Sequence, residues 1–248
     1  MQEPSTHSDY ERLDGAVPLL YPPGLEERAL ELRGILETGS RELSSLLGME
    51  PPALQALLVA DEDWREAPRE SVRPYPPGLL YFTRATLPPV LVLPERLSPA
   101  FGPRTEATLP LTVWHELAHA FLLREETVRT PPWLREFVPQ AAAAAVARRT
   151  GTPLEEHLSR AEAEAGFDVR AFGGPADAGR QMAFQNALLA LGNDALEEFG
   201  EEFLGRLVRA LWDEESVVNG RRAEELLADS LGDGGREWLA SRPEFREG

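Results

Sequence analysis

Two histidines and one glutamate that could do chemistry lie together in residues 114–120, which read Trp-His-Glu-Leu-Ala-His-Ala. On an α-helix, residues four apart lie on the same face, so His115 and His119 can offer two imidazole nitrogens to one metal ion. A water molecule activated by zinc needs a base close by, and the carboxylate of Glu116 suits that role. The spacing therefore predicts a zinc site with Glu116 as general base.

The alternative is that these side chains are ordinary polar groups of a buried helix. A lone buried histidine is more often hydrogen-bonded in a core than bound to a metal. Here, however, three ionisable groups share one apolar segment, where each costs several kcal/mol unless something compensates it. A bound dication would compensate all three together, so the metal interpretation is favoured. The apolar neighbours are Leu111, Val113, Trp114, Leu117, Phe121 and Leu122.

A catalytic zinc usually takes three protein ligands, so two histidines leave one ligand to find. The chain has no Cys, which restricts the choice to histidine and carboxylates. Glu136, in Pro132-Trp133-Leu134-Arg135-Glu136, is one candidate, although a first-turn glutamate is also favoured by the helix dipole alone. Glu125 and Glu126 compete with it, but they follow His119 closely and are expected to be exposed.

A histidine helix followed by a Trp-Leu-x-Glu helix resembles the gluzincin clan of zinc metallopeptidases, which have the thermolysin-like fold. The resemblance is greatest to small bacterial members of largely unassigned substrate. It implies that His115, His119 and Glu136 bind one zinc ion per chain and that Glu116 is the general base. It also implies an α+β fold, with a small mixed sheet before the active-site helix and a mostly helical C-terminal half. The specific motifs occupy residues 114–136 only.

This chain departs from the family pattern in two places. The family usually continues Glu-Gly-x-Ala, whereas Glu136 is followed by Phe-Val and Pro139. Because Pro139 lacks an N–H and would clash with the carbonyl of Arg135, the helix should either kink there or start afresh there. Relatives also commonly bind the developing oxyanion with a downstream Tyr or His. No Tyr follows residue 81, and the only later histidine, His157, is predicted to lie on the surface of a helix.

The stretch 180–186 lies where a later helix of the family approaches the site. Arg180 or Gln181 could therefore polarise a substrate carbonyl, although ordinary surface polarity explains both residues as well. The family also has a substrate-side edge strand at the end of its sheet. In this sequence the run 90–93 takes that place, with Val90, Leu91 and Val92 as the residues that would align a peptide.

The N-terminal part of the sequence predicts a tail and then one long helix. Residues 1–20 are expected to form a flexible tail, because residues 1–17 are polar and aperiodic. Leucines at helical spacing then predict a helix from Pro22-Pro23-Gly24 to Gly48, with Gly39 as the point where it could break.

Short apolar runs follow this helix and predict a small sheet. Residues 78–83 and 90–93 are expected to be strands, residues 54–60 a strand or a short helix, and residues 61–77 a loop. Prolines bracket the run 90–93 at Pro89 and Pro94, which favours an edge strand or a short strand over the middle of a long one.

Helices are predicted for the rest of the chain. Thr108 should cap the histidine helix, which carries Pro110 in its first turn and ends at Leu123 or Arg124. The next helix should begin at Thr130-Pro131-Pro132. Beyond residue 150 the helices are separated by turns, and two leucine-rich stripes are expected to be core. These turns are Gly166, Gly173-Gly174-Pro175, Gly192-Asn193 and residues 232–235, and the stripes are Leu204, Leu207, Val208, Leu211 and Ala223, Leu226, Leu227, Leu231.

The predicted domains are a catalytic part at 21–150 and a helical part at 151–248 packed on the same domain.

The composition excludes some classes of partner. A net charge of −17 argues against nucleic acid and against anionic membranes, which both need a basic surface. No signal peptide and no apolar run long enough for a membrane span is visible, so a cytoplasmic protein is expected.

Three functions remain open at this point. The first is a zinc-dependent peptidase acting on peptide or protein substrates. The second is a metal-binding module that has lost peptidase activity, which the absent Tyr and Pro139 favour. The third is a metalloprotease dedicated to one partner protein.

Overall fold

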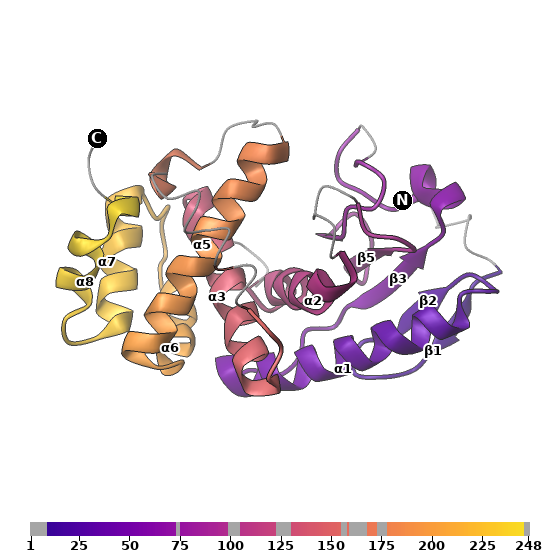
Figure 1. Cartoon of the computed structure of the whole chain (residues 1–248), viewed down its shortest axis with the longest axis horizontal. Helices are drawn as coiled ribbons and strands as arrows, with labels where there is room; N and C mark the ends of the chain where they lie inside the picture. The colour runs from indigo at the N-terminus through magenta and orange to yellow at the C-terminus, as the bar shows by residue number, and fades with distance from the viewer. Residues whose placement is uncertain are drawn as a thin grey trace. The chain divides into compact units, whose positions relative to one another are not determined.

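The computed structural model describes residues 9–72, 75–98, 105–122, 130–154, 158, 168–172 and 178–245, and the chain has an α+β fold (Figure 1). It comprises two compact units. The first contains residues 1–41 and 50–121, and the second contains residues 42–49 and 122–248. The units thus divide at 121/122, whereas the sequence analysis placed a boundary at 150/151. None of the helices in the described part of the chain is long and apolar enough to cross a membrane.

The first unit is built on a mixed five-stranded sheet with the order β1-β2-β3-β5-β4. The β2, β3 and β5 strands are parallel, while β1 and β4 are antiparallel to their neighbours at the two edges. Buried apolar side chains from β3, β4 and β5 form a core with Trp64 and Ala67. The strands are β1 (Glu11–Leu13), β2 (Leu19–Tyr21), β3 (Gln55–Val59), β4 (Tyr81–Thr83) and β5 (Val90–Pro94).

The β1 strand and the first two residues of β2 lie where a tail was predicted, so that prediction is wrong for residues 11–13 and 19–20. Val17 and Leu19 are buried, and the Tyr21 hydroxyl donates a hydrogen bond to Glu11 on the neighbouring strand. Strands of three residues contain too little alternation to be recognised in a sequence. Residues 1–8 lie outside the described residues.

The strand β5 is in the interior of the sheet, which corrects the prediction of an edge strand at 90–93. It pairs with β3 on one side and β4 on the other, and Val90, Leu91 and Val92 are all buried. The bracketing prolines are tolerated because they lie at the ends of the ladder. The Pro89 carbonyl accepts from the N–H of Gln55, and the Glu95 N–H donates to Val59 just beyond Pro94. The edge strand on this side is β4.

Two long helices accompany the sheet: α1 (Glu26–Leu47) and α2 (Thr105–Leu122). The α1 helix ends as predicted at Gly48, which has φ +67°, but it is not broken at Gly39. Gly39 instead lies against α2, where an added Cβ would come within 2.4 Å of the Trp114 ring. The α2 helix begins a turn earlier than expected, so Thr108 and Pro110 are inside it and Thr108 is not its cap. A short 3-10 helix, η1 (Asp61–Glu66), lies within the predicted loop.

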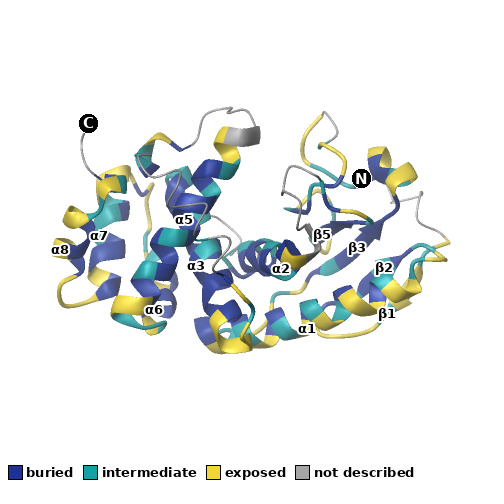
Figure 2. Cartoon of the chain, in the orientation of Figure 1, coloured by how far each residue is buried: buried dark blue, intermediate teal, exposed yellow. Residues whose placement is uncertain are grey.

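Beyond residue 121 the described segments of the second unit contain helices and no strand, as predicted. The α3 helix begins after Pro131 and continues through Pro139 to Thr150, so no new helix starts at that proline. The predicted turn at Gly192 is wrong, because this glycine lies within α5. The predicted stripes on α6 and α7 are confirmed as buried, with Leu211 half-buried (Figure 2). The helices are α3 (Pro132–Thr150), α5 (Ala178–Phe199), α6 (Glu202–Trp212), α7 (Gly220–Leu231) and α8 (Gly235–Ser241), with short turns at η3 (Val169–Ala171) and η4 (Pro243–Phe245).

The close approach of α3 and α5 explains why Gly192 is inside a helix. A Cβ added at Gly192 would lie 2.8 Å from the Cα of Ala141, closer than real side chains approach a backbone. The run of alanines at 141–145 is buried and likewise presents little bulk. The two helices can therefore pack nearly backbone to backbone. Gly192 was predicted to mark a turn, but its lack of a side chain instead allows α5 to approach α3.

Candidate metal centre

The α2 helix is held by one large side chain next to the first histidine. Trp114 is 3 % exposed, and its indole N–H donates to the carbonyl of Ile35 on α1 at 3.1 Å. Its ring packs directly over Gly39, where only a glycine leaves room. Because Trp114 is fixed in this way, the rotation of α2 about its axis is fixed too, and with it the direction of His115 and His119.

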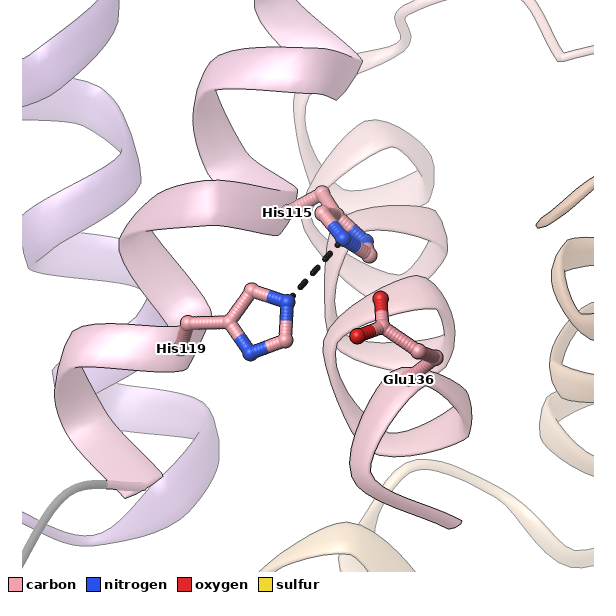
Figure 3. Close-up of side chains that lie close together, drawn as sticks. All are labelled: His115, His119 and Glu136. Atoms are coloured by element: carbon pink, nitrogen blue, oxygen red, sulfur yellow. Dashed lines mark hydrogen bonds between the residues drawn. The ribbon is translucent and has the colours of Figure 1, made fainter. Parts of the chain in front are cut away.

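The two histidines point their Nε2 atoms toward each other, as the i, i+4 spacing predicts (Figure 3). These atoms are 3.2 Å apart, and the ring planes are nearly perpendicular, at 85°. Two nitrogens bound to one tetrahedral zinc ion are separated by about 3.3 Å. The observed separation therefore fits two ligands of one ion, although two neutral histidines can also form a hydrogen bond at this distance.

Glu116 lies beside the histidines and is tied to the edge of the sheet. One of its carboxylate oxygens is 3.8 Å from His115 Nε2, and its other oxygen accepts a hydrogen bond of 3.1 Å from the backbone N–H of Phe82 on β4. The side chain is 19 % exposed, so it has access to solvent. A carboxylate held in this position can accept a proton from a water molecule next to the histidines.

Glu136 completes the group that the sequence analysis assembled. The nearest donor atoms of His115, His119 and Glu136 lie within 4.8 Å of one another, and the group could hold a metal ion (Figure 3). Glu136 is half-buried on α3, between Trp133 and Phe137, which are 1 % and 0 % exposed.

Arg180 and Gln181, which were predicted to stabilise an oxyanion, are not the residues of α5 that contact the candidate ligand Glu136. Arg180 and Gln181 are exposed near the start of α5, and the Arg180 guanidinium lies over the ring of Phe184 at 5.8 Å. Gln185, one turn further along α5, donates instead to a carboxylate oxygen of Glu136 at 2.9 Å. The sequence analysis missed this residue, and its only signal was a place on the same helical face as Gln181. His157, Glu125 and Glu126 lie outside the described residues.

Comparisons with known proteins give this chain no relative. It matches no family model, no curated protein and no solved structure.

Proposed function

We propose that this protein is a zinc-dependent peptidase of the gluzincin type. The observation that carries the proposal is the pair of histidine Nε2 atoms at 3.2 Å, with the Glu116 carboxylate next to them. The resemblance of residues 114–136 to gluzincins supports it from the sequence side. The small mixed sheet before α2 and the helices after it agree with a thermolysin-like arrangement at the level of the α+β class.

The donor set favours a transition-metal ion such as zinc over calcium and magnesium. Two imidazoles and one carboxylate are the ligands of known catalytic zinc sites that leave a position open for water. Calcium and magnesium prefer sites made of oxygen ligands alone, which do not contain histidine pairs. A zinc ion held by these residues would polarise a scissile carbonyl and lower the pKa of a bound water molecule to about 7.

Glu116 is the residue proposed to move the proton. Its carboxylate accepts a proton from the attacking water and then transfers it to the amine that leaves the cleaved peptide bond. The hydrogen bond from the Phe82 N–H holds one oxygen in place, which orients the other oxygen toward the histidines. Glu116 thus acts as base and then as acid without contributing a ligand.

A peptide substrate is proposed to pair with the edge strand β4. Phe82 lies opposite Leu91 in the register with β5, yet its N–H is directed at Glu116 and not at β5. The outer side of β4 is therefore next to the general base. A peptide added along this edge by backbone hydrogen bonds would run past Glu116.

A second candidate is a metal-binding module without peptidase activity. It is favoured by the absence of any Tyr after residue 81 and by the exposed positions of Arg180 and Gln181. In that case the metal site would serve binding or stability, and no residue would be needed for an oxyanion.

Metal analysis combined with a cleavage assay tests the proposal. After loading with excess zinc and dialysis, the protein should retain one zinc per chain and cleave an unstructured protein or members of a broad peptide library. Retention of well under one equivalent would overturn the metal site. One full equivalent without any cleavage would leave the non-catalytic module or a protease dedicated to one partner.

A further inference from the structure

Behind Glu136, two glutamine side chains form a continuous hydrogen-bonded chain. Gln185 on α5 donates through Nε2 to Oε2 of Glu136 at 2.9 Å, and its Oε1 accepts from Nε2 of Gln140 at 2.5 Å. Gln140 follows Glu136 by one turn on α3, so both residues face α5. All three side chains are half-buried and belong to the second unit.

The chemistry of the three side chains fixes which group donates and which accepts in each of these hydrogen bonds. An ionised carboxylate can only accept hydrogen bonds, so Gln185 must present its NH2 group to Glu136. The carbonyl oxygen of Gln185 is then turned toward Gln140, which must donate. Neither amide can be flipped without placing two acceptors or two donors against each other. The arrangement therefore has one direction, and it delivers an N–H to the carboxylate.

The helix packing described above makes this contact specific. Gln185 precedes Gly192 by two helical turns, so both lie on the face of α5 that meets α3. Gln140 directly precedes Ala141, the residue that Gly192 approaches most closely. The close crossing thus brings the Gln185 amide to Glu136 and holds it there.

We propose that Gln185 is a positioning residue for the metal ligand Glu136, with Gln140 orienting Gln185 in turn. The proposal deepens the proposed function and depends on metal binding by Glu136. An N–H held on one carboxylate oxygen fixes the plane of the carboxylate and favours coordination through a single oxygen. Partners of this kind behind a ligand commonly change metal affinity by 10- to 100-fold when they are removed.

The competing explanation is that the amides only join α3 to α5. A purely structural contact would contribute to the stability of the metal-free protein and leave the geometry of the bound ion unchanged. A positioning residue must affect the ion itself. Metal affinity and the spectrum of a bound ion therefore separate the two explanations.

The experiment compares Gln185→Met with the wild-type chain. Methionine has a similar length and a good helix propensity but cannot donate to Glu136. Zinc affinity, measured by competition with a chelator, should fall by about 10- to 100-fold. The visible spectrum of the cobalt(II)-loaded protein, which reports the number and arrangement of ligands, should change as well. Gln181→Met, the same substitution one turn earlier at an exposed position of α5, should retain the wild-type affinity and spectrum.

The outcomes distinguish this proposal from the proposed function. If the wild-type chain binds no zinc, both are overturned. If the wild-type chain binds zinc and Gln185→Met binds it equally well with an unchanged cobalt spectrum, only the role of Gln185 is overturned. Should Gln185→Met fail to fold, Gln140→Met carries the test, with an expected fall in affinity of several-fold. Wild-type affinity in that variant would also overturn the proposal.

Discussion

At the scale of single residues, some side chains of residues 114–119 in α2 pack in the core, and others carry the groups that could do chemistry. Trp114, Leu117 and Ala118 are 3 %, 0 % and 1 % exposed and hold the helix in the core of the first unit. The intervening His115, Glu116 and His119 carry the reactive nitrogens and the carboxylate. Because anchors and functional groups alternate along one turn of helix, a small rotation of α2 would displace all three functional groups together.

The first prediction concerns Glu116. Glu116→Gln keeps nearly the same volume and retains an oxygen that can accept from the Phe82 N–H, but it cannot accept a proton. Zinc content and fold should therefore remain, while peptidase activity falls by about 10²–10⁴-fold. Metal analysis and cleavage of an unstructured protein substrate measure the two properties on the same samples.

Two further variants serve as references for this prediction. Glu198→Gln makes the same change at an exposed position of α5 and should leave metal content and cleavage unchanged. His119→Ala removes a ligand, so zinc affinity and activity should fall together. Full activity in Glu116→Gln would contradict its role as general base.

The sequence identified four residues of the candidate centre because their signals are local or belong to a short motif. His115, Glu116 and His119 share one helical turn, and Glu136 stands in a Trp-Leu-x-Glu motif. Gln185 gave no such signal, since its contact with Glu136 depends on where α5 crosses α3. That crossing is set by Gly192 and Ala141, which are 51 residues apart in the sequence, and it has no local pattern.

At the scale of elements, two helix ends were predicted correctly, whereas the edge position of a strand was not. Gly48 and Pro131-Pro132 mark helix ends through the conformations that their own backbones allow. The edge position of a strand depends instead on which other strand pairs with it. Leu91 and Val92 gave no information about β4, so the edge was assigned to the wrong strand.

The crossing of α3 and α5 leads to a prediction about stability. Gly192→Ala places a methyl group 2.8 Å from both the Cα and the Cβ of Ala141, so the two helices must separate. The cost of overpacking, about 1–3 kcal/mol, should exceed the gain of about 0.5–1 kcal/mol from replacing a helical glycine. Chemical denaturation should therefore show a lower free energy of unfolding.

Gly34→Ala provides the matched control for this variant. Gly34 lies within α1, and an added Cβ would meet no atom within 4 Å. Only the gain in helix propensity remains, so this variant should be more stable than the wild-type chain by about 0.5–1 kcal/mol. Equal effects of the two substitutions would contradict the packing explanation for Gly192.

A second prediction at this scale concerns the ion pair at the end of α3. Arg149 forms a two-pronged contact with Glu201, with an Nε–Oε2 distance of 2.9 Å, and it also contacts Glu42 on α1. The hydrogen bond from Arg149 lowers the pKa of Glu201 in the folded chain. A lowered pKa means that the contribution to stability is present above the unfolded pKa of about 4.3 and is lost as the pH falls through the folded pKa.

Glu201→Gln should therefore destabilise the chain at pH 7 by less than about 1 kcal/mol, since the pair is partly exposed. The difference from the wild-type chain should shrink as the pH is lowered below about 4.3. Denaturation curves for both proteins across this pH range measure the effect. A difference that stays constant with pH would show that the ion pair does not contribute through the charge of Glu201.

At the scale of the whole molecule, 42 acidic side chains and a net charge of −17 complicate any measurement of metal binding. Exposed carboxylates attract divalent cations weakly without forming a site, and this attraction is screened by salt. Binding to the candidate centre must therefore be separated from binding to the surface as a whole. The stability of the chain can make this distinction, because one tight site and many weak ones respond differently to a single substitution.

The last prediction uses this difference. An ion that binds only the folded chain stabilises it by about 2.7 kcal/mol when its free concentration is 100 times the dissociation constant. For a chain of this size the midpoint of thermal unfolding should rise by about 5–10 °C when zinc is added at moderate salt, and a chelator should reverse the rise. His119→Ala removes one ligand but leaves the acidic surface intact, so its midpoint should respond far less to the same zinc concentration. An equal rise in both proteins would assign the stabilisation to surface carboxylates and not to the His115, His119 and Glu136 centre.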